Sequence, residues 1–445
     1  MRCSQTASSE PNDDARMNPT ISSDPLPYPL AARTGLIDPF HVMELAKRAA
    51  ALEAAGHPVI HMSIGEPDFT APEPVVDALG RAARAGHTQY TAATGLASLR
   101  EAIARDYGER HGLDIAPSRI IVTAGASAAL SLAVCSLVNP GDGVLMTDPS
   151  YPCNRHFVSA FDGIPQLVPV GPDTRFQLTR ELLEANWAAN TRGTLLASPA
   201  NPTGTSIPWD ELARIVDATR ARGGFTLVDE IYLGLSYDGT PRSALALGED
   251  LIVTNSFSKY FHMTGWRLGW LVVPEALAPV FEKLSQNLYI CASTLAQHAA
   301  LACFDSESLA IFEARRDEFR RRRDWIVPAL GRIGLEVPVM PDGAFYAWAD
   351  CSRFGGDSSG LANDLLEKAW VSVVPGKDFG RHDPDRWIRL SYATSLEKME
   401  EAVDRMGRYL SARDSQAAAG ARCRAPLMWP AANSSVGRRS YTGAP

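Results

Sequence analysis

One short stretch of the sequence combines a lysine, Lys259, with hydroxyl groups and an arginine. It lies between two apolar runs, 251–253 and 270–273, the first of which reads as a buried strand. A lysine in an apolar pocket loses its proton more easily, because desolvation disfavours the ammonium, and its free amine can form a Schiff base. Ser256 and Arg267 supply the hydroxyl and the charged donors that a phosphate needs. A lone lysine after a strand is more often a solvated loop residue, so the hypothesis depends on the whole stretch.

A run of small residues predicts an anion-binding turn. The strand-like run 119–123 ends in Gly125, Ala126 and Ser127, which lead into a helical pattern. The free N–H groups and the dipole of a helix N-terminus favour a bound anion. The pattern is weaker than a P-loop, since neither GxxxxGK[ST] nor GxGxxG is present. Together with the two donors near Lys259, the turn can form a single phosphate site.

Polar side chains also follow the apolar runs 194–197 and 225–228. Asn201 lies in a loop that two X–Pro steps restrict to extended or turn geometry. Asp229 ends the second run directly, and Tyr232 follows it. A carboxylate in that position is costly unless it has a partner. Because parallel sheets bind ligands just past their strand ends, these side chains are candidates for the same site.

Four other residues are candidates on weaker local evidence. Arg389 lies in the apolar run 387–391, where an arginine is hard to explain without a ligand. Gly65 precedes Glu-Pro and would allow a ligand to approach the backbone, although a simple turn is the plainer interpretation. Tyr90 and Tyr151 lie in loops, where a tyrosine is ordinarily a surface or core residue.

The order of these motifs resembles the class I/II pyridoxal-phosphate aminotransferases, the large fold-type-I family. The resemblance covers roughly residues 36–410 and depends on the lysine stretch, NPTG, the Asp–x–x–Tyr pair and RLSYA. It implies a pyridoxal 5'-phosphate cofactor. It also implies an enzyme of amino-acid metabolism that moves an amino group between an L-amino acid and a 2-oxo acid by a ping-pong mechanism.

The resemblance implies a role for each residue that contacts the cofactor ring. Lys259 would form the Schiff base and transfer the proton. Asp229 would pair with the pyridine nitrogen, Tyr232 and Asn201 would contact the phenolic oxygen, and Tyr151 would stack on the ring.

The same resemblance implies which residues bind the cofactor phosphate. Ser256, Arg267 and the turn at Ala126 and Ser127 would bind it from within the chain. Tyr90 would reach across a homodimer to the phosphate of the partner subunit.

The substrate carboxylate would be bound by Arg389, with Gly65 and Asn201 beside it. One position departs from the family pattern, because His262 stands three residues after Lys259, where relatives usually have a small residue. We interpret His262 as a tolerated substitution, with a substrate contact as the alternative.

Strands alternate with helices from about 75 to 300, which predicts an α/β fold with a mostly parallel sheet covered on both faces. A smaller α+β domain should complete it. The expected division is a disordered N-terminus (1–27), the N-terminal part of the small domain (28–70), the large cofactor domain (71–309), the C-terminal small domain (310–411) and a disordered tail (412–445). Met17 could be the natural start.

The chain of 445 residues is long enough for two packed domains. Its formal net charge of −8 gives no basic footprint for nucleic acid, and the arginines 320–323 read as a solvated helix face. Seven scattered cysteines predict free thiols and no metal site. Without a signal peptide or a long apolar run, we expect a cytoplasmic protein with no membrane partner.

Other functions stay open at this point. Some fold-type-I relatives are C–S β-lyases, and some are regulatory domains that bind the cofactor and control transcription. The regulatory proteins carry a basic winged-helix domain before the fold, whereas only a short acidic-to-neutral segment precedes it here.

The sequence gives one indication of the amino donor. Some dicarboxylate-specific relatives carry a lysine where Ser127 stands, and the segment 285–290 is uncharged. A neutral donor, small, aliphatic or aromatic, is therefore favoured over aspartate. Arg33 or an arginine of a partner subunit could supply the missing charge. The individual amino acid, the 2-oxo acid and the pathway are not determined by the sequence.

Overall fold

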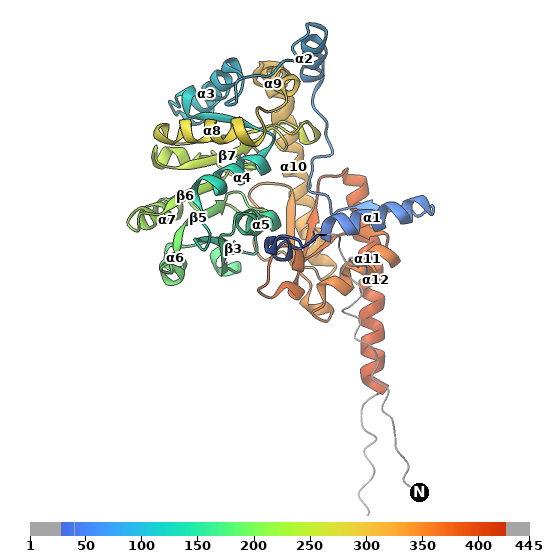
Figure 1. Cartoon of the computed structure of the whole chain (residues 1–445). Helices are drawn as coiled ribbons and strands as arrows, with labels where there is room; N and C mark the ends of the chain where they lie inside the picture. Colours follow the sequence, from blue (N-terminus) through green and yellow to red (C-terminus); the bar gives the residue numbers. More distant parts are fainter. Residues whose placement is uncertain (1–27, 40, 424–445) are drawn as a thin grey trace, which may run out of the picture.

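The computed structural model describes residues 28–39 and 41–423 (Figure 1). The predictions for residues 1–27, including Met17, and for residues 424–445 lie outside these ranges. Within them, no helix has both the length and the apolar character needed to cross a bilayer.

A seven-stranded sheet forms the centre of the larger part of the molecule, in the order β2-β8-β7-β6-β5-β3-β4. Its strands are β2 (Ile120–Thr123), β3 (Gly143–Asp148), β4 (Ile164–Pro169), β5 (Thr191–Ala197), β6 (Phe225–Asp229), β7 (Ile252–Ser256) and β8 (Gly269–Val272). Only β8 runs antiparallel to its neighbours, β2 and β7. The other pairs are parallel, as the alternation of strands and helices predicts.

Helices cover both faces of this sheet. One apolar core joins the sheet to α4 (Ala126–Leu137), α5 (Pro152–Ala160) and α8 (Ala278–Leu288). A second core joins the other face to α3 (Ala97–His111), α6 (Arg180–Asn186) and α7 (Trp209–Arg220). Strands such as β2 and β8 are buried along their whole length, which explains their continuous apolar sequences.

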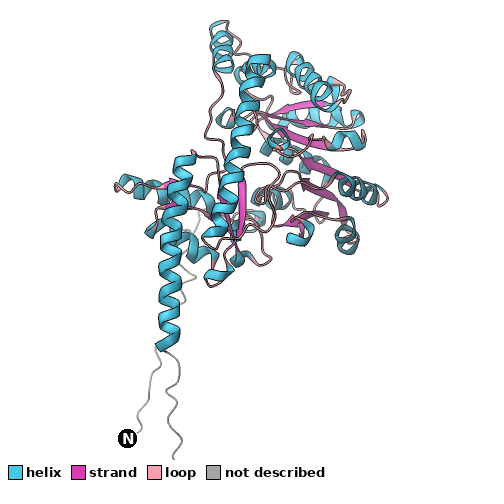
Figure 2. Cartoon of the chain, turned by 180° about the vertical axis from the view of Figure 1, so that it is seen from behind, coloured by secondary structure: helices cyan, strands magenta, loops and turns pink. Residues whose placement is uncertain are grey.

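A three-stranded antiparallel sheet, in the order β11-β12-β9, forms the centre of the smaller part. It contains β9 (Tyr346–Asp350), β11 (Val374–Pro375) and β12 (Trp387–Ser391), with α10 (Ser306–Arg332), α11 (Ser358–Lys368) and α12 (Leu396–Cys423) around it (Figure 2). The N-terminal segment joins this part, because β1 (Ile60–His61) pairs with β10 (Val371–Ser372) next to α1 (His41–Ala54). The predicted α/β class with a smaller α+β part is confirmed, while the exact domain boundaries stay a prediction.

Several expected elements differ in the structure. The sequence of 336–339 reads as a short strand, but in the structure only Glu336 forms a bridge, to Asp350. The sequence of 287–303 reads as one helix, but the structure interrupts it between the end of α8 and the start of α9 (Thr294–Ala300), where Ile290 has a φ of 71°. The hydroxyl of Ser293 accepts from the amide of Ala296 and so begins a new helix.

The tail was expected to lack structure from residue 412. Helix α12 instead continues to Cys423, so this expectation is wrong over 412–423. The Ala- and Arg-rich composition that lacks an apolar period also has high helix propensity, which explains the error.

The arginines 320–323 are not a uniform solvated face. Arg322 and Arg323 are each 5% exposed. Arg322 pairs with Asp68 at 2.8 Å, and Arg323 pairs with Asp238 at 2.8 Å. Half of the cluster therefore connects α10 to other segments, and the expectation of a solvated face was wrong for these two residues.

Candidate active site

A cavity of about 460 Å³ opens beside the carboxyl ends of β5 and β6 and the loop after β7. Most of the site residues predicted from the sequence line it: Gly65, Ala126, Ser127, Tyr151, Asn201, Asp229, Tyr232, Lys259, Arg267 and Arg389. Two do not. Ser256 lies directly behind the lining, and Tyr90 is 79% exposed elsewhere on the surface.

Lys259 projects from the loop after β7 into this cavity. Its ammonium donates a hydrogen bond to the carbonyl oxygen of Gly65. Burial lowers the pKa of Lys259 to about 8. Near neutral pH, far more of this lysine is therefore in the neutral, nucleophilic form than of a solvated lysine.

Asp229 is the last residue of β6 and is 5% exposed. One of its oxygens accepts from the amide of Ile231 at 3.1 Å. Burial raises the pKa of Asp229 to about 7, against the opposing effects of the Ile231 amide and the charge of Lys259. No ion pair joins Asp229 to a cation among the described residues, so a cation bound in the cavity would stabilise the carboxylate.

The N-terminus of α4 and Arg267 form a cradle for an anion. A Cβ at Gly125, whose φ is 84°, would lie 2.7 Å from Nη2 of Arg267. Glycine therefore allows the guanidinium to lie against the backbone where α4 begins. Ser258 also lines the cavity, and the hydroxyl of Ser256 donates to that of Ser258 at 2.9 Å.

Arg389 in β12 is 2% exposed and already held in place. Nη1 donates to Oδ1 of Asn201 at 2.9 Å, and Nη2 donates to the carbonyl of Ser63 at 2.6 Å. Its Nε is buried and makes no hydrogen bond to the described residues. The guanidinium is thus preorganised and retains donor capacity for a ligand.

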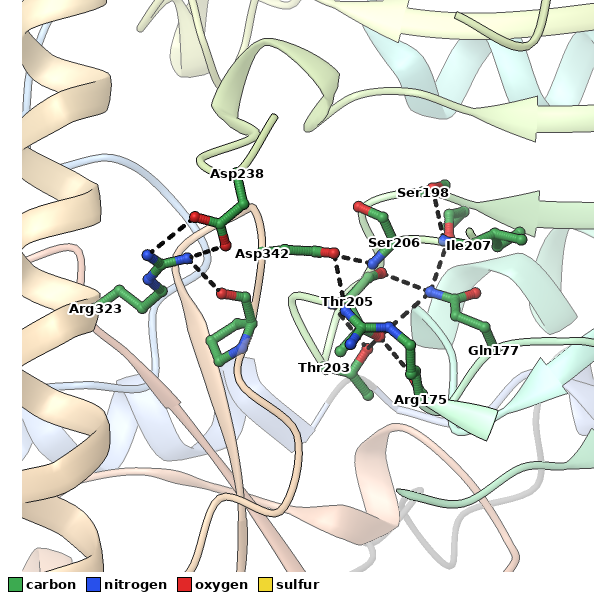
Figure 3. A network of polar contacts seen from close by, with 12 residues as sticks. Arg175, Gln177, Ser198, Thr203, Thr205, Ser206, Ile207, Asp238, Arg323 and Asp342 are labelled. Atoms are coloured by element: carbon green, nitrogen blue, oxygen red, sulfur yellow. Dashed lines mark hydrogen bonds and ion pairs between the residues drawn. The ribbon is translucent and has the colours of Figure 1, made fainter. Parts of the chain in front are cut away.

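The loop that carries Asn201 is attached to the segment before β9 (Figure 3). The backbone amides of Asp342 and Gly343 donate to the carbonyl of Gly204 at 2.9 and 3.0 Å. The carboxylate of Asp342 accepts from the amide of Ser206 at 2.8 Å and from Arg175 at 2.9 Å. These bonds connect the part that carries Asn201 to the part that carries Arg389.

Comparison with known proteins identifies the family. The model of the aminotransferases of class I and II matches residues 57–406. This chain belongs to the class I and II aminotransferases. Like the other members of the family, this aminotransferase is an enzyme that depends on pyridoxal phosphate.

The matches cover almost the full length of each relative. A valine–pyruvate aminotransferase of Mycobacterium tuberculosis is 39% identical over 86% of this chain and 98% of the relative. An aspartate aminotransferase of Thermotoga maritima is 34% identical over 83% of this chain and 96% of the relative. The crystal structure of an aminotransferase from M. tuberculosis matches with a TM-score of 0.84 and 38% identity, over 86% of this chain and all of that one. The predicted family, fold class, activity and cofactor are confirmed.

The described residues of the aminotransferase fit its cofactor. Asp229 is a buried carboxylate with no ion-pair partner among the described residues, and a protonated pyridine nitrogen would supply one. The cradle at Gly125 and Arg267 suits a phosphate, and Lys259 is an amine of lowered pKa. No group of His, Cys, Asp and Glu in the described ranges could hold a metal ion.

His262 lies outside the lining of this cavity. It is 3% exposed, and its ring packs against Phe69, Phe312 and Phe319. Burial lowers the pKa of His262 to about 3, which keeps the ring neutral. The structure therefore makes it an aromatic core residue of the aminotransferase rather than a residue of the cavity wall.

Sequence reasoning missed two parts of the site. Tyr346 in β9 lines the cavity, with its hydroxyl 2.7 Å from that of Tyr232. Helix α1 contributes an apolar wall of Val42, Met43 and Ala46. The apolar pattern of each segment predicts burial alone, and contacts between residues so distant in sequence left no local signal.

Proposed function

We propose that this aminotransferase takes the amino group from a neutral L-amino acid. The observation that carries the proposal is the apolar wall formed by Val42, Met43 and Ala46, continued by Ile64. A second carboxylate against this wall would lose its hydration without gaining a cation.

The charged residues of the cavity support this choice. Its cations are Lys259, Arg267 and Arg389, and each has another role in the proposed site. Glu66, the remaining acid of the lining besides Asp229, would repel a second carboxylate. Arg33 is no substitute, because it pairs with Asp162 at 3.1 Å and does not line the cavity.

The relatives are divided on the substrate. One bears the name valine–pyruvate aminotransferase, whereas others bear the name aspartate aminotransferase. The higher identity to the valine–pyruvate enzyme agrees with an aliphatic donor, but the lining of the cavity is the stronger argument.

We assign the following roles within the site. Arg389, held by Asn201, binds the α-carboxylate and so fixes the direction of the Cα–H bond. As a neutral amine, Lys259 would take the proton from Cα and deliver it to the cofactor carbon that is bonded to the amino nitrogen. The cofactor, when bound, accepts the electron pair that the broken Cα–H bond leaves. Asp229 stabilises positive charge on the ring nitrogen, and Tyr232 donates to the phenolic oxygen.

The remaining assignments concern how the cofactor is held. The turn at Ala126 and Ser127 and the side chain of Arg267 bind the phosphate, with the hydroxyl pair of Ser256 and Ser258 beside them. Tyr151 lines the cavity and would stack on the ring. Gly65 leaves room for the substrate carboxylate.

We further propose a cytoplasmic homodimer in which Tyr90 completes the phosphate site of the partner subunit. Tyr90 is 79% exposed, and the backbone beside it is anchored by a hydrogen bond of 2.7 Å from Thr294 to the carbonyl of Gln89. The cysteines for which the structure describes side chains are free thiols, which agrees with a reducing compartment.

The test compares kcat/KM for valine, alanine and phenylalanine with that for aspartate. We expect the neutral donors to be preferred. Met43→Arg places a cation on the apolar wall and should shift the ratio toward aspartate by about tenfold, whereas the matched variant Met43→Leu should not. A native preference for aspartate would contradict the proposal. Release of pyruvate from S-substituted cysteines without an amino acceptor would instead indicate a C–S β-lyase.

A further inference from the structure

Two buried tyrosine hydroxyls meet at the wall of the cavity. Tyr232, which follows β6, and Tyr346, in β9, are 2.7 Å apart at their oxygens and are 4% and 0% exposed. Each hydroxyl carries one proton, so only one of them can donate to the other. The direction of this hydrogen bond decides which proton remains for a ligand.

We propose that Tyr346 is a positioning residue that donates to Tyr232 and thereby leaves the proton of Tyr232 for the cofactor. The inference depends on the proposed role of Tyr232 toward the phenolic oxygen. The new element is that Tyr232 depends on a second tyrosine, and that the two residues come from the two parts of the fold.

The charges around the pair favour this direction. The guanidinium of Arg389 lies 4.4 Å from the ring centroid of Tyr346. Burial raises the pKa of both hydroxyls, and Arg389 opposes this rise at both, but its guanidinium lies directly against the ring of Tyr346. The more acidic phenol is the better donor, and a hydroxyl that accepts a hydrogen bond donates more strongly in turn. Tyr151 and Lys259 also face Tyr232.

The backbone around Tyr346 fixes its position. A Cβ at Gly65 would lie 2.9 Å from the Tyr346 hydroxyl, so glycine makes room for it. The segment before β9 is held to the loop of Asn201 through Asp342 and Gly343 (Figure 3). Tyr346 therefore has one neighbour that serves the cofactor, Tyr232, and one that serves the substrate carboxylate, Arg389.

The hydroxyl and the ring of Tyr346 can be tested separately in the holoenzyme. Tyr346→Phe removes only the hydroxyl. It should raise the pH midpoint of the visible absorbance change of the lysine-bound cofactor by about half to one pH unit, because Tyr232 donates less strongly to the phenolic oxygen. Tyr232→Phe, measured in parallel, should raise this midpoint further. KM for the amino donor should stay near its native value in Tyr346→Phe, since the ring under Arg389 remains.

Tyr346→Leu removes the ring as well. It should raise KM for the amino donor by roughly three- to tenfold in addition to the shift of the midpoint. Tyr392→Phe is the control, because Tyr392 is a fully buried tyrosine of the same part of the fold that does not line the cavity. Its absorbance midpoint should equal that of the native enzyme.

Three results would overturn the inference. A native midpoint in Tyr346→Phe together with a raised one in Tyr232→Phe would leave the role of Tyr232 standing and refute that of Tyr346. Native midpoints in both variants would refute both roles. An equal rise in Tyr392→Phe would show that any lost buried hydroxyl has this effect.

Discussion

Two adjacent carboxyl groups at the end of β6 have different surroundings. Asp229 faces the cavity, whereas Glu230 accepts hydrogen bonds from Ser243 at 2.9 Å and from the amide of Ala244 at 2.6 Å. Burial raises the pKa of each to about 7. Of the two, only Asp229 has an oxygen available to a ligand. The carboxyl group of Glu230 instead holds the neighbouring segment in place.

This burial makes the stability of the cofactor-free protein depend on pH. Between about pH 4 and pH 7, folded Asp229 keeps a proton that the unfolded chain releases, so the free energy of unfolding falls as pH rises through this window. In Asp229→Asn the free energy of unfolding should decrease less over this pH range, because the amide does not titrate. Urea unfolding of the cofactor-free native and variant proteins at pH 5 and pH 7.5 measures it.

Glu230→Gln is the matched comparison at the neighbouring position. It should flatten the fall as well but leave cofactor affinity nearly native, whereas Asp229→Asn should weaken it. If the pH dependence of Asp229→Asn equals that of the native protein, Asp229 is not the buried acid described here.

The site residues that sequence could identify share a simple local signal. Asp229, Asn201 and Lys259 are polar residues just past apolar runs, and a family motif surrounds each of them. Tyr346 gave no such signal, because an apolar strand with a tyrosine is ordinary and its partner hydroxyl is 114 residues away.

At the scale of elements, continuous apolar runs predicted most strands of the seven-stranded sheet. Strand β4 and helices α5 and α6 were not predicted. The side chains of β4 are mostly half-buried or exposed, so its sequence lacks a clear apolar run. Helices α5 and α6 are short, and short helices depend on tertiary packing more than on their own propensity.

The loop of Asn201 depends on one glycine. Gly204 has a φ of 68°, and a Cβ there would lie 2.6 Å from Cβ of Pro341 and 2.9 Å from the carbonyl of Gly343. We expect Gly204→Ala to destabilise the protein by about 2–4 kcal/mol, because it combines a strained backbone with a clash against the segment before β9.

Gly223→Ala is the control, since Gly223 has a φ of 67° and nothing within 4 Å of a Cβ. It should lower the free energy of unfolding by about 1–2 kcal/mol, which is the cost of a left-handed backbone conformation alone. Chemical denaturation of both variants measures the difference. Equal losses would mean that the contact between the two parts of the fold does not constrain this loop.

At the scale of the whole molecule, the proposed dimer can be tested by complementation. A subunit with Lys259→Ala lacks its own reactive amine but still offers Tyr90, and a subunit with Tyr90→Ala has the opposite defect. Because each mixed dimer rebuilds one complete site, equal mixing should restore about a quarter of the native activity. Activity no higher than that of the separate variants after subunit exchange, or an active monomer in sedimentation, would contradict the arrangement.

The pairing of β1 with β10 has a consequence for the order in which the chain folds during its synthesis. Ile60 pairs with Val371, so β1 leaves the ribosome long before its partner exists. At ordinary translation rates the delay is on the order of 15–60 s. The seven-stranded sheet, complete by residue 272, can form meanwhile. Arg389 comes later still, so a nascent chain can form the sheet's side of the cavity before it has the arginine that we propose binds the substrate carboxylate.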